Sequence, residues 1–557
     1  MKRLSVAVVV MLAILGVVRR APAAHGERRL ALVEATLDEL DAALRARTVS
    51  SEQLVQRYLA RVAAYDKVGP TLNAVLHLND HALDDARARD QARRHGHARG
   101  PLFGIPILLK DNIDTRDQPT TAGSVALAGS IPPDDAFITK RLRGAGAVIL
   151  GKATLTEFAN FIAIGMPSGY SSLGGYGLNP YDPRPAPGGD GRPVLTPGGS
   201  SSGPGIAVAA NLVAVAIGTE TSGSILSPSS ANGVVGIKPT LGLVSRTGIL
   251  PITGDQDTAG PIARTVSDAA IVLGIIAGFD RDDPATLACL FPGNCHKDYT
   301  RFLDKHALEH ARIAVPRVPY WNGFTPAQTQ IMLDAIAALR AAGAEVVDPL
   351  ELPNQADISA FGICTSFPAP ETCSTVLMYG QQHDLNAYLA RRPNAPVHSL
   401  ADIIAFNNAH PATALKYGQA LFDAANQLDT RDGSADTQRF LADRARDLLL
   451  TQTGLDGVLD GPDGVEGTHD DFDAILFPQN RGAAAPAKAG YPTIVVPGGF
   501  VPPAGDVIAP APFGIAFTGR AFSEPRLIGL AYAFEQATHH RAPPPSAPAL
   551  PGDILGR

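Results

Sequence analysis

Two serine clusters flank a long apolar segment in the stretch Gly198–Ser224, which reads GGSSSGPGIAVAANLVAVAIGTETSGS. The first cluster, Ser200–Ser202, precedes an Ala- and Val-rich segment that predicts a helix, so these serines would lie at the positive end of a helix dipole. Ser224 follows Gly223, and a residue without a Cβ lets the backbone and a ligand approach closely. Taken alone, the first cluster would also suit a helix N-cap.

A lysine lies at the end of a second apolar run, Ile105–Leu109. Because Lys110 is followed by the polar residues Asp111 and Asn112, we expect it at the end of a buried strand, next to a cleft. A serine needs a base within hydrogen-bond reach to become a nucleophile, and burial favours the neutral form of lysine. The two patterns together indicate a serine hydrolase whose base is not a histidine. From composition alone, Lys110 would instead be a surface or ion-paired lysine.

Short apolar runs alternate with helical patterns and predict an α/β fold, with a mixed central β-sheet covered by helices on both faces. The runs are continuously apolar, which is typical of strands buried on both faces. The predicted strands are Ile105–Leu109, Ala147–Leu150, Val213–Ile217, Ala474–Phe477, Thr493–Val496 and Phe513–Phe517. We therefore expect strands from both ends of the sequence to close one sheet.

Helical spacing of apolar residues predicts an outer helical layer before the sheet and a mostly helical interval 307–450. The predicted helices lie within 36–64, 79–95, 135–144, 331–342 and 441–451.

The first residues resemble a secretory signal. Lys2 and Arg3 precede the apolar run Leu4–Val18, and Ala21–Ala24 offers a small-residue cleavage site. The run is shorter than the roughly 20 residues that span a bilayer, so we expect a periplasmic or secreted protein without stable membrane insertion after cleavage; an uncleaved anchor is the alternative.

The net charge of −7, with mixed signs, provides no basic face for nucleic acid.

Export also bears on the four cysteines, for which the simplest pairing is two local disulfides, Cys289 with Cys295 and Cys364 with Cys373. Neither pair has histidines at zinc-finger spacing, so no metal site is expected there.

The Asp-rich segment Gly454–Asp473 lacks regular EF-hand spacing. It is either a solvated loop or a Ca²⁺ site built from carboxylates. No cofactor is expected.

These motifs resemble the amidase signature family, whose members share a Gly-Gly-Ser-Ser turn, an apolar helix and an Asp/Glu-Thr-x-Gly-Ser-Ile turn. Here the turns are Gly198–Gly203 and Glu220–Ile225. The resemblance continues through Gly104–Asn112, Gly151–Ala153, Gly233–Thr240, Gly242–Arg246, Gln256–Pro261, Ala489–Pro492 and Phe517–Ala521. It covers most of the chain and is strongest to the branch that contains bacterial peptide amidases, which remove ammonia from C-terminal peptide amides. It implies the amidase signature fold.

The resemblance implies that Ser224 is the nucleophile, Lys110 the base, and Ser200, on a cis peptide bond, the proton relay between them. It implies hydrolysis of a C–N amide bond in a small-molecule or peptide amide through a seryl acyl-enzyme. The family's oxyanion hole corresponds to the backbone N–H groups of Thr221, Ser222, Gly223 and Ser224.

Two residues near the nucleophile depart from the family pattern. Ser222 stands where Gly or Asp is usual, and Leu226 where Arg, Val or Thr is common. We expect the Ser222 side chain to influence which substrate fits. The substrate pocket is expected to draw on Asn160–Tyr181, Ala356–His383 and the C-terminal strands.

Two other functions remain possible from the sequence. The segment Gly199–Gly203 also satisfies the G-x-S-x-G nucleophile elbow, which would make Ser201 the nucleophile and a late histidine, His539 or His540, its base. The other alternative is an inactive binding protein on an inherited amidase fold.

The predicted domain organisation follows from these assignments. A signal peptide occupies residues 1–24, one amidase domain residues 25–540, and a Pro-rich tail residues 541–557. The predicted domain consists of a core at 100–270, a helical insertion at 300–450 and C-terminal strands within 474–540.

Overall fold

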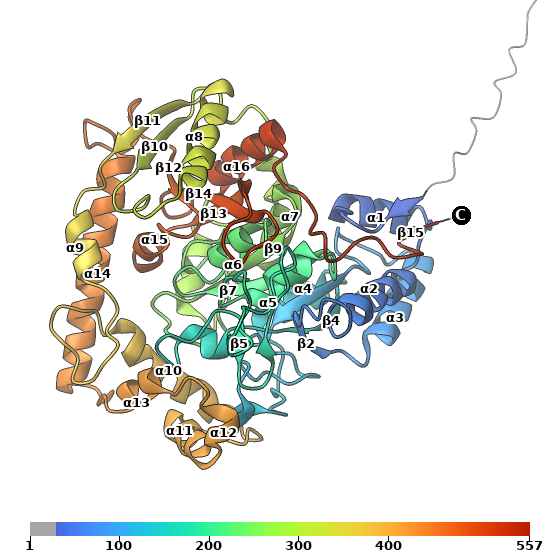
Figure 1. Cartoon of the computed structure of the whole chain (residues 1–557), viewed down its shortest axis with the longest axis horizontal. Coiled ribbons are helices and arrows are strands. Elements are labelled where there is room, and N and C mark those ends of the chain that lie inside the picture. Colours follow the sequence, from blue (N-terminus) through green and yellow to red (C-terminus); the bar gives the residue numbers. More distant parts are fainter. Residues whose placement is uncertain (1–28, 557) are drawn as a thin grey trace, which may run out of the picture.

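The computed structural model describes residues 29–556, so the expected signal peptide lies outside the described residues. Its centre is a mixed sheet of 11 strands (Figure 1). In sheet order the strands are β11 (Glu345–Leu350), β10 (Arg312–Pro316), β12 (Ala474–Pro478), β14 (Ala511–Thr518), β13 (Thr493–Val501), β8 (Val235–Lys238), β9 (Thr258–Ala263), β7 (Val215–Glu220), β3 (Pro106–Lys110), β4 (Val148–Ala153) and β2 (Val75–Leu78). All six strands predicted from the sequence belong to this sheet.

The sheet joins the two ends of the chain at β8 and β13. These strands run antiparallel, and Ile237 pairs with Ile494. Parallel pairs lie on either side of this junction: β3 with β4 and β7, and β10 with β11 and β12. The predicted closure of one sheet from both ends of the sequence is therefore confirmed.

Helices cover both faces of the sheet. α7 (Val266–Ile276), α8 (Pro326–Ala341) and α16 (Glu524–Thr538) pack together with α4 (Phe137–Gly144) over one face, whereas α5 (Ser202–Ala209) and α6 (Leu226–Ala231) cover the other. The remaining helices are α1 (Leu37–Arg45), α2 (Ser51–Tyr65), α3 (Ala82–Arg94), α9 (Gln355–Ala360), α10 (Val376–Ala390), α11 (Leu400–Ala409), α12 (Pro411–Ala414), α13 (Ala420–Ala425), α14 (Ala435–Leu459) and α15 (Ala484–Ala489). The two-residue strands β1 (Leu30–Ala31) and β15 (Ile554–Leu555), and β5 (Tyr170–Ser171) and β6 (Gly175–Tyr176), form two small separate sheets.

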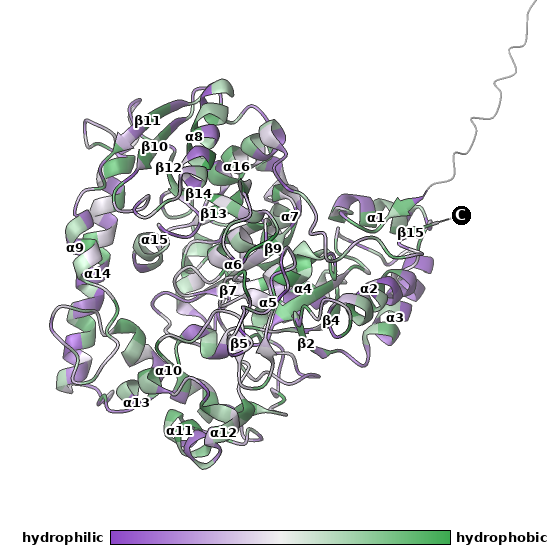
Figure 2. Ribbon diagram, in the orientation of Figure 1, coloured by the Kyte–Doolittle hydropathy of each residue, from purple (hydrophilic) through white to green (hydrophobic). Residues whose placement is uncertain are grey.

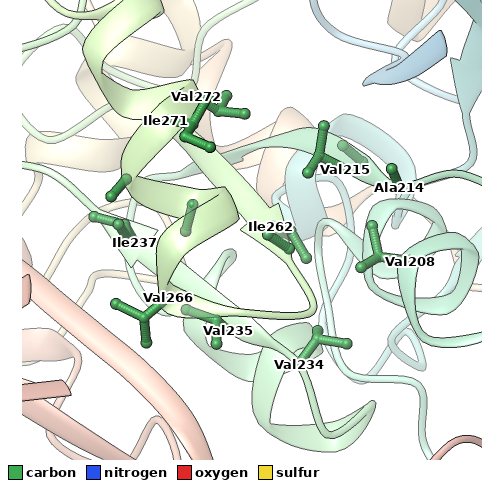
Figure 3. Close-up of a cluster of buried hydrophobic side chains, with 14 of the residues drawn as sticks. Val208, Ala214, Val215, Val234, Val235, Ile237, Ile262, Val266, Ile271 and Val272 are labelled. Atoms are coloured by element: carbon green, nitrogen blue, oxygen red, sulfur yellow. The ribbon is translucent and has the colours of Figure 1, made fainter. Parts of the chain in front are cut away.

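The core lies between the central strands and their helices. Figure 2 shows the hydrophobic residues gathered on these strands and on the helix faces turned toward them. In Figure 3, Val208 of α5, Val215 of β7, Val235 of β8 and Ile262 of β9 cluster with Val272 of α7, and all five are fully buried. Continuous apolar strands are thus buried on both faces, as expected.

The interval 307–450 differs from the mostly helical prediction because it contributes β10 and β11 to the main sheet. β10 has only five residues and begins with Arg312, so it is too short to distinguish strand from helix by periodicity. β11 forms the sheet edge and contains Pro349, a residue that edge strands tolerate but that weakens a strand prediction.

Both expected disulfides are present, Cys289–Cys295 and Cys364–Cys373. In the described part of the chain, no helix has the length and apolar character needed to cross a membrane.

The Asp-rich segment begins inside α14, and its carboxylates are engaged by protein groups. Arg520 hydrogen-bonds to Asp456 and Asp460, and Arg526 binds Asp473 at 2.7 Å. Among the described residues, no three His, Cys, Asp or Glu side chains form a group that could hold a metal ion.

The Pro-rich tail packs along the domain. Its strand β15 pairs with β1, and the Asp553 carboxylate accepts a hydrogen bond from the fully buried Arg61 at 2.6 Å. Arg541 forms an ion pair with Glu34 at 2.7 Å. The tail therefore closes over the first helices and neutralises a buried guanidinium.

We expect Asp553→Ala to lower the free energy of unfolding by about 3 kcal/mol, because it leaves a buried cation without its counter-charge. Asp84→Ala is the matched control: this carboxylate is exposed and pairs with the exposed Arg87, so its loss should cost less than about 1 kcal/mol. Urea unfolding measures both values. Equal, small losses for the two variants would contradict the structural role assigned to the tail.

Candidate active site

The amino group of Lys110 lies at the end of β3 and is fully buried. Its Nζ donates hydrogen bonds to Ser200 Oγ at 2.7 Å, Thr219 Oγ1 at 2.9 Å and Thr219 O at 3.2 Å. All five positions of β3 are buried, because the strand lies between β4 and β7 in the interior of the sheet. The expectation of a lysine at the end of a buried strand is therefore confirmed.

The surroundings of Lys110 favour its neutral form. Burial lowers the pKa of Lys110 from 10.5 to about 7, although the carboxyl groups of Asp257 and Glu220 act in the opposite direction. Removal from water disfavours the ammonium ion more than these carboxyl groups stabilise it. A substantial fraction of Lys110 can therefore accept a proton near neutral pH.

A second buried lysine, Lys152 of β4, has a different environment. Its Nζ lies 3.5 Å from the Asp111 carboxylate and donates to Thr120 Oγ1 at 2.8 Å. Burial lowers the pKa of Lys152 as well, but the nearby carboxyl groups of Asp111 and Asp114 act in the opposite direction. Lys110 has no carboxylate among its hydrogen-bond partners, so it is the better candidate for a base.

The two serine turns of the sequence lie against each other. Ser201 N–H donates to Ser224 O at 3.1 Å, and the Gly199–Ser200 peptide bond is cis. Ser200 is fully buried and Ser224 is 7% exposed. The structure thus joins Lys110 directly to Ser200 and brings the turn of Ser224 beside them.

Glu220 organises the turn that carries Ser224. Its carboxylate accepts hydrogen bonds from the N–H groups of Gly223 at 2.7 Å, Ile225 at 2.7 Å and Leu226 at 3.1 Å. Gly223 adopts a φ of +82°, a conformation that favours glycine. This role of Glu220 was not predicted, although the sequence shows an acidic residue between a buried strand and a glycine turn.

These contacts correct one expectation for the oxyanion hole. The N–H of Gly223 is engaged by Glu220, whereas the N–H groups of Thr221, Ser222 and Ser224 donate to no acceptor within the described chain. Three of the four expected donors therefore keep no protein acceptor in the described chain.

The nucleophile-elbow alternative lacks a base. The Ser201 hydroxyl is fully buried, donating to Thr219 O at 3.0 Å and accepting from Thr219 N–H at 3.2 Å. No histidine in the described residues hydrogen-bonds to it. His539 caps α16, and the ring of His540 packs near Phe534.

A cavity of about 390 Å³ opens beside the serine turn, where Ser222 and Gln256 line it. Its other lining residues come from 319–320, 355–363 and 481–488. Among them, Ile358, Ser359 and Phe361–Ile363 lie within the range Ala356–His383 from which the substrate pocket is expected to draw. The C-terminal contribution comes from α15 and the loop before it rather than from the strands, and no residue of Asn160–Tyr181 lines this cavity. We call it the front cavity.

Glu220→Gln should release the serine turn, because an amide has one acceptor oxygen and its NH₂ group would face backbone N–H donors. We expect fluorophosphonate labelling of Ser224 to slow about 100-fold. The matched control is Glu309→Gln, since Glu309 is exposed and its ion-pair partner among the described residues is the exposed His306. An unchanged labelling rate in Glu220→Gln, measured by mass spectrometry, would rule out this role.

Comparison with known proteins agrees with these observations. The sequence model of the family described as Amidase matches residues 53–528. A probable amidase of Arabidopsis thaliana is 38% identical and aligns over 92% of this chain and 91% of its own length. The native peptide amidase of Stenotrophomonas maltophilia is 42% identical, with a TM-score of 0.78 over 92% of this chain and 98% of that one. A peptide amidase in complex with the competitive inhibitor chymostatin is also 42% identical, with a TM-score of 0.80 over 92% and 99% of the two chains.

The family match includes the strands and turns that carry Lys110, Ser200 and Ser224. The resemblance to peptide amidases noted from the motifs is confirmed by the 42% identity to two such structures. The chain therefore belongs to the amidase family and is a hydrolase that acts on amide bonds.

Proposed function

We propose that this protein is an exported amidase that hydrolyses C–N amide bonds through a seryl acyl-enzyme. Ser224 is the nucleophile, Ser200 the proton relay and Lys110 the base. The observation that carries this proposal is the 2.7 Å hydrogen bond from Lys110 Nζ to Ser200 Oγ inside a fully buried site. A base acting on a serine must lie within such a distance.

In acylation, neutral Lys110 accepts a proton from Ser200 while Ser200 accepts one from Ser224. The Ser224 oxygen attacks the substrate carbonyl carbon. The developing oxyanion is stabilised by the free N–H donors of the turn, Thr221, Ser222 and Ser224. As the C–N bond breaks, the relay returns the proton to the leaving nitrogen. Water then attacks the acyl-enzyme with the same relay, which releases the acid and restores Ser224.

We propose C-terminal peptide amides as substrates, with ammonia as the first product. The similarity to peptide amidases supports this class. The front cavity has an apolar wall that includes Tyr320, Ile358 and Phe361, with Gln355 and Arg481 among its polar residues. The apolar wall suits a peptide side chain, and the polar residues suit the peptide backbone beside it. Ser222 lines the same cavity next to the reacting serine, so it contributes to substrate selection.

Export is proposed from two features of the chain. The N-terminal segment 1–24 has the charged start, apolar run and small-residue site of a signal peptide. The chain also has two disulfides, and disulfides form and persist mainly in proteins of oxidising compartments. The periplasm or the extracellular medium is the proposed location.

Ammonia release from a C-terminal peptide amide tests the proposed residue roles. Ser224→Ala and Lys110→Ala should each lower kcat about 10⁴-fold or more, because residues of such a unit act together. Ser200→Ala should also lower kcat strongly, since it interrupts the relay. Circular dichroism checks that each variant is folded.

His539→Ala and His540→Ala serve as controls and should retain the wild-type rate. Loss of activity in either histidine variant, together with an active Lys110→Ala, would instead support the nucleophile elbow at Ser201.

A further inference from the structure

A small cavity of about 10 Å³ is lined by Thr219, a hydrogen-bond partner of Lys110, and shares no lining residue with the front cavity. Its polar lining residues are Asn112, Thr219, Thr221, Arg246, Asp257 and Thr258. A volume of this size accommodates one water molecule, provided that two or more polar groups face it.

Two polar atoms of this lining lack a protein partner. Asn112 Oδ1 and Thr258 Oγ1 are both buried and form no hydrogen bond within the described chain. The other end of the Asn112 amide is occupied, since Nδ2 donates to Thr219 Oγ1 at 3.0 Å. Buried polar atoms in native proteins are nearly always paired with protein groups or ordered water. These two atoms therefore indicate a bound water.

Hydrogen bonds extend from this cavity in two directions. On one side, Lys110 Nζ donates to Thr219 Oγ1 at 2.9 Å. On the other, Thr221 Oγ1 donates to Asp257 Oδ1 at 2.5 Å. The second oxygen of Asp257 accepts from the N–H groups of Ile252 at 2.8 Å and of Thr253 at 3.0 Å. A water between the two threonines would complete a connection from the lysine to the Asp257 carboxyl group.

Few charged groups act on Lys110 and Asp257, the two ends of this connection. The charged groups that act on Lys110 are Asp257 and Glu220, and Glu220 is held by three backbone N–H donors. Arg246 and Asp384 act on Asp257 from the solvent side. Burial raises the pKa of Asp257 to about 7, close to the value of Lys110. Burial therefore shifts both groups toward their neutral forms.

Asp257 also faces a larger rear cavity of about 510 Å³. This cavity shares Arg246, Ile249 and Asp257 with the small one and reaches the exposed residues Asp134 and Lys140. Asp257 thus lies between the small cavity and solvent.

We propose that a water in the small cavity links Thr219 to Asp257, and that Asp257 receives the proton that Lys110 loses when it becomes the base. This inference rests on the proposed function. The Lys110 N–H bond breaks, Thr219, the water and Thr221 each accept one proton and pass one on, and an O–H bond forms on Asp257. No electrons are transferred and no co-reactant is needed. Asp257 acts through Thr221, the water and Thr219, so it is a positioning residue.

The pH dependence of kcat/KM for ammonia release tests this link in Asp257→Asn. Two coupled groups titrate together. The acidic limb of the wild-type kcat/KM profile should therefore extend over two steps. Asparagine cannot carry the negative charge that favours protonated Lys110. The variant should therefore show a single step, shifted to lower pH by about one unit.

The matched control is Asp134→Asn. Asp134 lines the same rear cavity but not the small cavity, so this variant should keep the wild-type pH profile of kcat/KM. If Asp257 only anchored Ile252 and Thr253, Asp257→Asn would lower kcat or stability but leave the acidic limb in place, and the proposal would be overturned. An active Lys110→Ala would instead refute the proposed function itself.

A high-resolution crystal structure of the wild type provides a test that needs no variant to fold. We expect density for a water within hydrogen-bond distance of Asn112 Oδ1 and Thr258 Oγ1. A cavity without such density would overturn the proposal.

Discussion

The burial of one amino group, that of Lys110, is the constraint on which the rest of the site depends. In water a lysine side chain is protonated at neutral pH and cannot act as a base. In this protein burial lowers its pKa to about 7, because β3 runs through the interior of the sheet between β4 and β7. The large sheet and its helical layers therefore do more than support loops: they keep water away from one nitrogen atom.

The polar groups around Lys110 are paired mainly with backbone rather than with opposite charges. Glu220 binds three N–H groups of the serine turn, and Ser201 binds the main chain of Thr219. Lys152, one strand away, has Asp111 as a close counter-charge instead. Because Lys110 lacks such a partner, it can lose its proton while its neighbours remain in place. In the same turn, the N–H groups of Thr221, Ser222 and Ser224 have no acceptor within the described chain, and we propose that they bind the oxyanion.

The sequence predicted the continuously apolar strands and the residues that the site brings together, because both depend on local patterns. Lys110 was singled out by the apolar run before it, whereas the roles expected of Ser200 and Ser224 came from the resemblance of the two serine turns to the amidase signature family. β8 and β9 were not predicted as strands, since glycine and proline interrupt their short apolar runs. The engagement of the Gly223 N–H by Glu220, three residues away, was missed because it depends on the conformation of the turn. Most of the lining of the front cavity was missed because it depends on how distant segments meet, which no local pattern records.

The pH dependence of Ser224 labelling by a fluorophosphonate tests the central claim most directly, because the reagent reads the reactivity of the serine without substrate binding or product release. If buried Lys110 is the base, the second-order labelling rate should rise with pH along a titration centred near 7, the pKa of Lys110. The rise should disappear in Lys110→Ala. A wild-type rate that is flat between pH 5 and 9, or that rises only near the ordinary lysine pKa of about 10.4, would contradict the account.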